Sequence, residues 1–181
     1  MNTKKISYTG ILAALTFLVL LLKTIPPLNI PLFPNAPFLT LDVKDAIIVI
    51  SGIFISPLSA VAIAIIVPFV EMITISNTGY IGLIMNIVSS LAFALPICFI
   101  YKKDFKSLIL GLIVGIVAMT VMMVLWNYFI TPIYMKLPRE ILAKMLLPLF
   151  VPFNATKGLL CSLLILILYK PVLKITNRIN L

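Results

Sequence analysis

The chain has 181 residues, of which 62% are hydrophobic and only 10% are charged, and its mean hydropathy is +1.23. A soluble domain typically carries about 25% charged residues, so this composition excludes a water-facing globule and indicates a protein that lies in lipid. The formal charge of +9 does not indicate nucleic-acid binding, because the basic residues form short clusters between apolar runs, as in membrane proteins.

The first element predicted is a membrane helix from Ile6 to Leu22. Lys4 and Lys5 precede it as in a signal peptide, but no small-residue cleavage site follows, so we expect a retained helix. The next stretch, Thr24 to Leu41, holds five prolines and cannot form a regular helix. Loops of this length are usually functional or disordered, and this one is too apolar for disorder, so we expect a long structured loop that folds over something.

The rest of the chain predicts five more spans, because a crossing needs about 20 apolar residues. They run over residues 43–55, 58–75, 80–101, 108–129 and 142–168. The second span is short, and the last is long and broken by Pro148 and Pro152. Thr131 to Lys144 is expected to be irregular. The sequence therefore predicts an all-α, polytopic membrane protein, with residues 1–181 forming one six-helix transmembrane domain.

The basic residues predict the orientation of the six spans. The side that holds both termini would carry eight of them: Lys4, Lys5, Lys102, Lys103, Lys106, Lys170, Lys174 and Arg178. The opposite side would carry five: Lys23, Lys44, Lys136, Arg139 and Lys144. Cytoplasmic loops are enriched in Lys and Arg, so both termini are expected in the cytoplasm and the first loop outside.

Lys157 is the most informative residue of the sequence. It lies thirteen residues from both Lys144 and Lys170, about 20 Å along a helix from each. A lysine at that depth costs about 2.5–3.5 kcal/mol on insertion scales and faces the protein interior. Asn154 lies on the same helix face, three positions earlier. Together they predict a polar patch that binds a ligand.

A structural alternative for Lys157 is an ion pair with an internal acid, for which Glu71 is the candidate. Glu71, however, lies late in its span, where we expect it to meet interfacial water or a loop. Asn127 lies between two aromatic residues near the end of the fifth span, in a predicted interfacial belt that explains the aromatic residues better than the asparagine. Asn86 is expected to hydrogen-bond between helices.

Gly10 and Ala14, with Ala13 beside them, form a small-xxx-small pattern that lets another helix approach closely. Either the pattern packs the bundle internally or it docks a partner subunit. Catalysis is not indicated, because the chain has no His, no Walker A pattern and no Cys/His metal cluster. Active transport by this chain would therefore draw its energy from a partner or an ion gradient.

Five segments in this order and spacing resemble one family of membrane proteins. They are Phe38 to Asp45, Ser56 to Ala60, Gly82 to Asn86, Trp126 to Tyr134 and Pro152 to Gly158. Over nearly its whole length, the chain is similar to the substrate-binding S component of energy-coupling-factor (ECF) vitamin transporters, specifically the riboflavin-binding member.

The resemblance implies a riboflavin-binding subunit of the bacterial plasma membrane, without a cofactor of its own. It also implies assembly with a transmembrane coupling subunit and two cytoplasmic ATPases, docked through Gly10, Ala13 and Ala14. Asn127, Asn154 and Lys157 would contact the flavin, and the loop from Ala36 through Phe38 to Leu39 would form part of a lid.

Three alternatives remain open on the sequence. The first is an S component for another vitamin, such as pantothenate or folate, whose carboxylate would pair with Lys157. The second is a membrane enzyme, which the lack of His and of paired carboxylates disfavours. The third is an assembly factor without a ligand, which would leave Lys157 unexplained.

Overall fold

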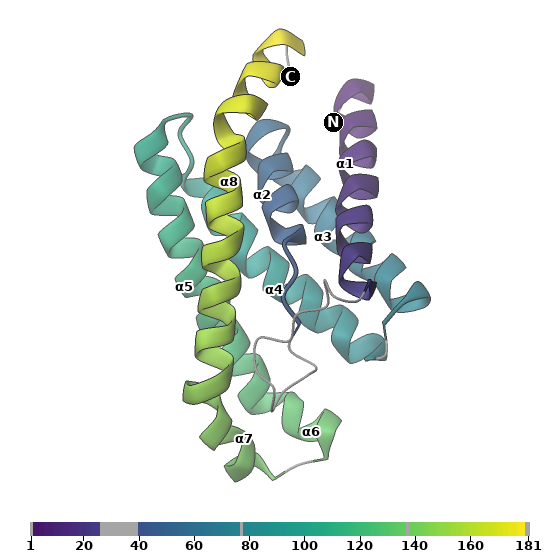
Figure 1. The fold of residues 1–181 in the computed structure, drawn as a ribbon, viewed down its shortest axis with the longest axis vertical. Coiled ribbons are helices and arrows are strands. Elements are labelled where there is room, and N and C mark those ends of the chain that lie inside the picture. Colours follow the sequence, from purple (N-terminus) through teal and green to yellow (C-terminus); the bar gives the residue numbers. More distant parts are fainter. Residues whose placement is uncertain (1, 26–39, 77, 137, 180–181) are drawn as a thin grey trace.

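A computed structural model describes residues 2–25, 40–76, 78–136 and 138–179. These residues form helices and contain no strand. The long helices lie side by side in an elongated bundle, and both termini lie at the same end of it (Figure 1). The prediction of an all-α protein is confirmed.

The helices follow the predicted spans, with differences at their ends. They are α1 (Thr3–Leu21), α2 (Lys44–Phe54), α3 (Pro57–Thr74), α4 (Gly79–Ile100), α5 (Phe105–Phe129), α6 (Thr131–Met135), α7 (Arg139–Met145) and α8 (Val151–Ile179). A 3₁₀ turn (Leu22–Thr24) follows α1, and a π-helical turn (Leu146–Phe150) precedes α8.

The C-terminal half corrects two predictions. The stretch expected to be irregular, 131–144, holds α6 and most of α7, and α8 continues past Pro171 to Ile179. The predicted break is present as the π-helical turn that contains Pro148. Because proline has no backbone N–H, it cannot take part in the regular hydrogen-bond ladder of an α-helix.

Five helical segments of the described chain are long and apolar enough to cross a membrane. They are Thr3–Leu21, Pro57–Thr74, Gly79–Ile100, Phe105–Ile133 and Arg139–Arg178. The remaining predicted span, α2, has 11 residues and is about 16 Å long, half the thickness of a hydrocarbon core. A full crossing by α2 and the orientation of the bundle therefore stay predictions.

Local sequence explains where several helices begin. The Asn2 side chain accepts a hydrogen bond from the backbone N–H of Lys5 at the start of α1. Ser56 caps α3, whose first residue is a proline. Asp104 caps α5, and hydrogen bonds from the backbone N–H and the hydroxyl of Ser107 lower the pKa of its carboxyl below the usual value.

The short helix α2 lies at the centre of the bundle, where it packs against α1, α3, α4 and α8. Most of its side chains are buried, and those of Ile48 and Val49 are fully enclosed. Helices α4 and α5 approach closely at Gly111 and Gly115: a Cβ added at Gly115 would lie 2.8 Å from the carbonyl oxygen of Phe93.

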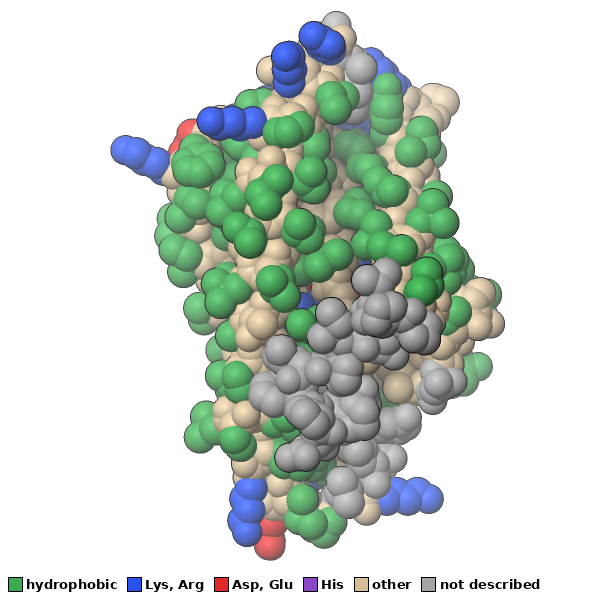
Figure 2. Space-filling model, viewed as in Figure 1, with side chains coloured by type: hydrophobic (Ala, Val, Ile, Leu, Met, Phe, Trp, Pro, Cys, Tyr) green, Lys and Arg blue, Asp and Glu red, His purple; other side chains and the backbone are tan. Residues whose placement is uncertain are grey.

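The side of the bundle is apolar and its ends are basic. Figure 2 shows hydrophobic side chains spread along the helices, with Lys and Arg gathered at the two ends. On α1, Gly10 and Ala14 are exposed, whereas Ala13 is half-buried and packs against the core. The two exposed small residues therefore leave part of the α1 surface free for another helix.

Candidate ligand-binding site

The described residues enclose a cavity of about 490 Å³ at the end of the bundle away from the termini. Its walls come from Thr40 and Asp42 before α2, the end of α3, the start of α4, the end of α5 and the start of α8. The apolar wall consists of Ile75, Ile81, Met85, Met123, Trp126, Phe150 and Phe153. A volume of this size lies in the range of small-molecule pockets.

The three predicted polar contacts, Asn127, Asn154 and Lys157, all line this cavity. They are 4%, 3% and 5% exposed, respectively. Asn127 comes from the last turns of α5, and the other two come from the first turns of α8. The structure thus brings together residues that lie about thirty positions apart in the sequence.

Both asparagines bond to the carbonyl oxygen one helical turn earlier. The Asn154 Nδ2 donates to the Phe150 carbonyl at 2.7 Å, and the Asn127 Nδ2 donates to the Met123 carbonyl at 2.7 Å. The Asn127 Oδ1 also accepts from the Thr131 hydroxyl at 2.9 Å. The side-chain carbonyl of Asn154 has no partner among the described residues, so it stays available as an acceptor.

Lys157 forms ion pairs with two acids, Asp42 just before α2 and Asp45 in its first turn. Its Nζ lies 2.9 Å from the Asp45 Oδ2 and 3.4 Å from the Asp42 Oδ2. The alternative partner considered from the sequence, Glu71, contacts other groups. An internal pair does exist, but it is made by acids that the sequence places at the edge of a loop.

Glu71 is buried, with 3% of its surface exposed, so the expectation that it meets interfacial water is wrong. Its Oε2 lies 3.5 Å from the Lys44 Nζ and accepts a hydrogen bond from the Asn86 Nδ2 at 3.2 Å. The Asn86 Oδ1 in turn accepts from Lys44 at 3.1 Å. The predicted interhelical role of Asn86 is confirmed, since it joins α4 to α2 and α3.

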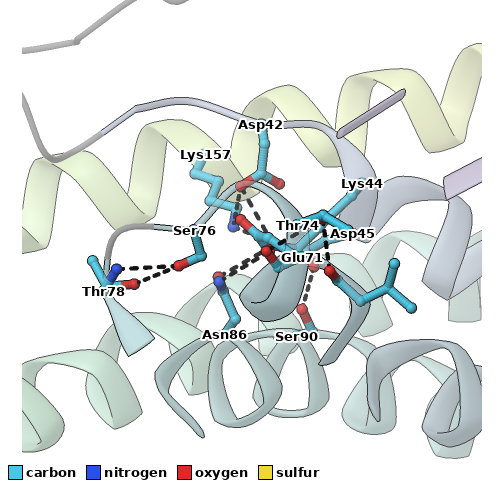
Figure 3. A network of polar contacts seen from close by, with 11 residues as sticks. Asp42, Lys44, Asp45, Glu71, Thr74, Ser76, Thr78, Asn86, Ser90 and Lys157 are labelled. Carbon is cyan, nitrogen blue, oxygen red and sulfur yellow. Dashed lines mark hydrogen bonds and ion pairs between the residues drawn. The ribbon is translucent and has the colours of Figure 1, made fainter. Parts of the chain in front are cut away.

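Lys44 and Asp45 also correct the predicted distribution of charge. Lys44 is expected among the basic residues at the outer side of the membrane, yet its side chain and that of Asp45 are 0% exposed. Figure 3 shows them inside the bundle, in a network with Asp42, Glu71 and Lys157. We call these five residues the buried charge cluster; it holds three carboxylates and two ammonium groups.

One feature of the sequence could have indicated the members of the buried charge cluster that were not predicted to lie inside the protein. Asp42, Lys44 and Asp45 directly precede or begin an apolar helix, and that helix is too short to span the bilayer. A short span can be enclosed by the others, and its charged end then lies inside the protein. The pairing partners could not be read, because they lie on α3, α4 and α8.

The remaining predicted contacts, Ala36, Phe38 and Leu39, lie outside the described residues. Among the described residues no group of three His, Cys, Asp or Glu side chains has the arrangement of a metal site. What the cavity offers is an aromatic and aliphatic wall facing amide, ammonium and carboxylate groups. This combination suits a flat organic molecule with one polar edge.

Apolar helices around a cavity with a partly polar wall define a polytopic membrane protein with a small-molecule site. Comparison with known proteins identifies the family. The profile described as ECF transporter, substrate-specific component, matches residues 4–169. The chain belongs to this family of transport proteins, and it is a multi-pass protein of the bacterial membrane.

Named relatives and a solved structure agree with this assignment. The chain is 31% identical to the riboflavin transporter RibU of Streptococcus thermophilus, over 98% of this chain and 87% of that protein. It is 29% identical to the riboflavin transporter FmnP of Bacillus subtilis, over 94% of each. The solved S component of a bacterial ECF transporter superposes with a TM-score of 0.79 at 25% identity, covering 97% of this chain and 98% of that one.

Proposed function

We propose that this protein is the riboflavin-binding S component of an ECF-type vitamin uptake transporter. The observation that carries the proposal is the cavity in which Asn127, Asn154 and Lys157 face an aromatic and aliphatic wall. Riboflavin has a flat, largely apolar ring system with carbonyls and ring nitrogens along one edge, and a chain of hydroxyl groups. Asparagine can donate and accept hydrogen bonds along such an edge, whereas lysine donates only.

The charges around the cavity favour riboflavin over an anionic vitamin such as pantothenate or folate. Lys157 already lies within 3.4 Å of two carboxylates, and Asp42 and Glu71 also line the cavity. A ligand carboxylate would meet more acids than bases there, and like charges at short range repel each other. Riboflavin is neutral and avoids this repulsion.

The proposed partners are a transmembrane coupling subunit and two cytoplasmic ATPases, which would supply the energy for uptake. We assign docking to the face of α1 that carries Gly10 and Ala14, since both are exposed and a Cβ added at Gly10 would meet no atom within 4 Å. Ala13 is half-buried against the core, so its contribution would be to hold α1 in place beside that face. The first loop, with Ala36, Phe38 and Leu39, is proposed to cover the ligand.

The absorption spectrum of the purified protein tests the function. We expect a yellow protein whose chromophore is identified as riboflavin by mass spectrometry. After the flavin is removed, added riboflavin should lose its fluorescence on binding, and neither pantothenate nor folate should compete. A colourless protein that leaves riboflavin fluorescence unchanged would refute the proposal, and displacement by either anionic vitamin would favour that vitamin instead.

A further inference from the structure

Asp45 does not line the cavity, yet its carboxylate is held on both sides. One oxygen, Oδ1, accepts a hydrogen bond from the Ser90 hydroxyl of α4 at 2.5 Å. The other, Oδ2, lies 2.9 Å from the Lys157 Nζ. Short O–H···O⁻ bonds of this kind are among the stronger hydrogen bonds in proteins, so the carboxylate has a fixed position between α4 and α8.

The ammonium group of Lys157 has three donors. The Lys157 Nζ donates a hydrogen bond to the Asp42 Oδ2 and forms an ion pair with the Asp45 Oδ2, and the Lys157 side chain lines the cavity. One N–H therefore stays available for a ligand. Where it points depends on the two acids, because the lysine side chain is long and loses much rotational freedom when it is held in place.

Asp45 differs from Asp42 as a partner of Lys157. Its contact with the Nζ is shorter, and its side chain is 1% exposed, compared with 10% for Asp42. Asp42 is also shared with Lys44, whose Nζ lies 3.7 Å from the same Oδ2. Glu71 pairs with Lys44 and Asn86. Among these acids, Asp45 is therefore the one that combines a close contact to Lys157 with a fixed anchor of its own.

We propose that Asp45 is a positioning residue for ligand binding: braced by Ser90, it fixes the Lys157 ammonium group so that one donor meets the ligand in the cavity. The inference rests on the proposed function, since the ligand is taken to be riboflavin. Asp45 itself does not touch the ligand.

A double-mutant cycle on riboflavin affinity tests the role. Asp45→Asn keeps the size of the side chain and an oxygen for Ser90 but removes the charge, and Lys157→Met removes the donors. We expect Asp45→Asn to weaken riboflavin binding at least tenfold when Lys157 is present. In the Lys157→Met background, the same change should alter affinity less than twofold, because the group that it positions is gone.

Thermal unfolding of the same variants gives a second measurement, in which Asp45→Asn should be favourable rather than harmful once Lys157 has been replaced. Lys157→Met leaves the Asp45 carboxylate buried beside no ammonium partner, which is costly. Adding Asp45→Asn should then raise the unfolding temperature while affinity stays low. Gly115→Ala is the matched destabilising control, because it disturbs the α4–α5 contact and should lower the unfolding temperature without weakening riboflavin binding.

Two results would overturn the inference while leaving the proposed function intact. One is an equal loss of affinity from Asp45→Asn in both backgrounds. The other is a comparable loss of affinity in Gly115→Ala at a similar fall in unfolding temperature, since either result would mean a merely structural role for Asp45. If the unmodified protein bound no riboflavin, the proposed function and the positioning role would fall together.

Discussion

Asn154 and Ser162 are both buried polar residues of α8, but they differ in their surroundings. Asn154 lines the cavity and keeps an available acceptor, whereas the Ser162 hydroxyl has no hydrogen-bond partner in the described part of the chain. Asn154→Ala should weaken riboflavin binding by about 1–3 kcal/mol, the usual cost of losing a buried hydrogen-bond partner. Fluorescence titration measures this loss.

Ser162→Ala is the control for that substitution. It removes a buried hydroxyl without breaking a hydrogen bond, so affinity should not change, and the free energy of unfolding should stay the same or rise by up to about 1 kcal/mol. Wild-type affinity in Asn154→Ala would remove Asn154 from the site. An equal loss in both variants would attribute the effect to α8 as a whole.

The main effect of the buried charge cluster is to fix the positions of helices relative to one another, rather than to add to the free energy of unfolding. Removing charges from solvent costs several kcal/mol per ion, and pairing offsets this only with good geometry. Here each lysine contacts two acids, and Ser90 and Asn86 satisfy further atoms. The arrangement fixes α2, α3, α4 and α8 relative to one another around one wall of the cavity.

The candidate site was only partly predictable from the sequence, for a physical reason. Lys157, Asn154 and Asn86 are polar residues inside apolar runs, and such residues must face the protein interior. Asp45 lies at the boundary between a loop and a span, where a charge is equally compatible with water. Its burial depends on the enclosure of α2 by four other helices, which no local pattern contains.

At the scale of helices, two glycines in different surroundings give opposite expectations for the same substitution. Gly115 faces α4, where an added Cβ would lie 2.8 Å from a backbone carbonyl, whereas an added Cβ at Gly10 would meet nothing within 4 Å. Gly115→Ala should lower the free energy of unfolding by about 1–3 kcal/mol through overpacking. Unfolding in detergent, followed by circular dichroism, measures it.

Gly10→Ala serves as the reference for the general effect of replacing a helical glycine. Alanine favours the helix by up to about 1 kcal/mol, so this variant should be as stable as the unmodified protein or slightly more so. If Gly115→Ala were equally harmless, α4 and α5 would not pack as closely as the structure has them.

Helix positions were largely predictable because long apolar runs between polar clusters leave few alternatives in a membrane protein. The ends were harder to predict. Thr131 to Lys144 contains prolines and charges, which suggested an irregular segment, yet Pro132 and Arg139 each lie in the first turn of a short helix. Proline is well tolerated there, because the first helical N–H groups have no partner in any case.

The close contact between α4 and α5 at Gly111 and Gly115 was not predicted from the sequence, although the four-residue spacing of these glycines is the same as that of Gly10 and Ala14.

At the scale of the whole molecule, the charges at the two ends predict the orientation in the membrane. Lys106 and Glu140 are exposed and lie at the starts of α5 and α7. In a background without Cys98 and Cys161, a membrane-impermeant maleimide should label Glu140→Cys in intact cells. It should label Lys106→Cys only after the cells are permeabilised, because the more basic end is expected to face the cytoplasm.

The reverse labelling pattern would show that the termini lie outside, and the cavity would then open toward the cytoplasm. Labelling of both positions in intact cells would place them on the same side of the membrane and would indicate an even number of crossings between them. Riboflavin binding by each cysteine variant checks that the labelled protein is folded.

The position of α2 has a consequence for how the protein is made. During synthesis, α2 leaves the ribosome with Lys44 and Asp45 at its start, but Glu71 follows Lys44 only after 27 residues and Lys157 follows Asp42 only after 115. An 11-residue segment with charges that still lack their partners cannot enter lipid as an independent helix. The interior is therefore completed last, when the C-terminal helix arrives, and for α2 membrane integration and tertiary folding are one event.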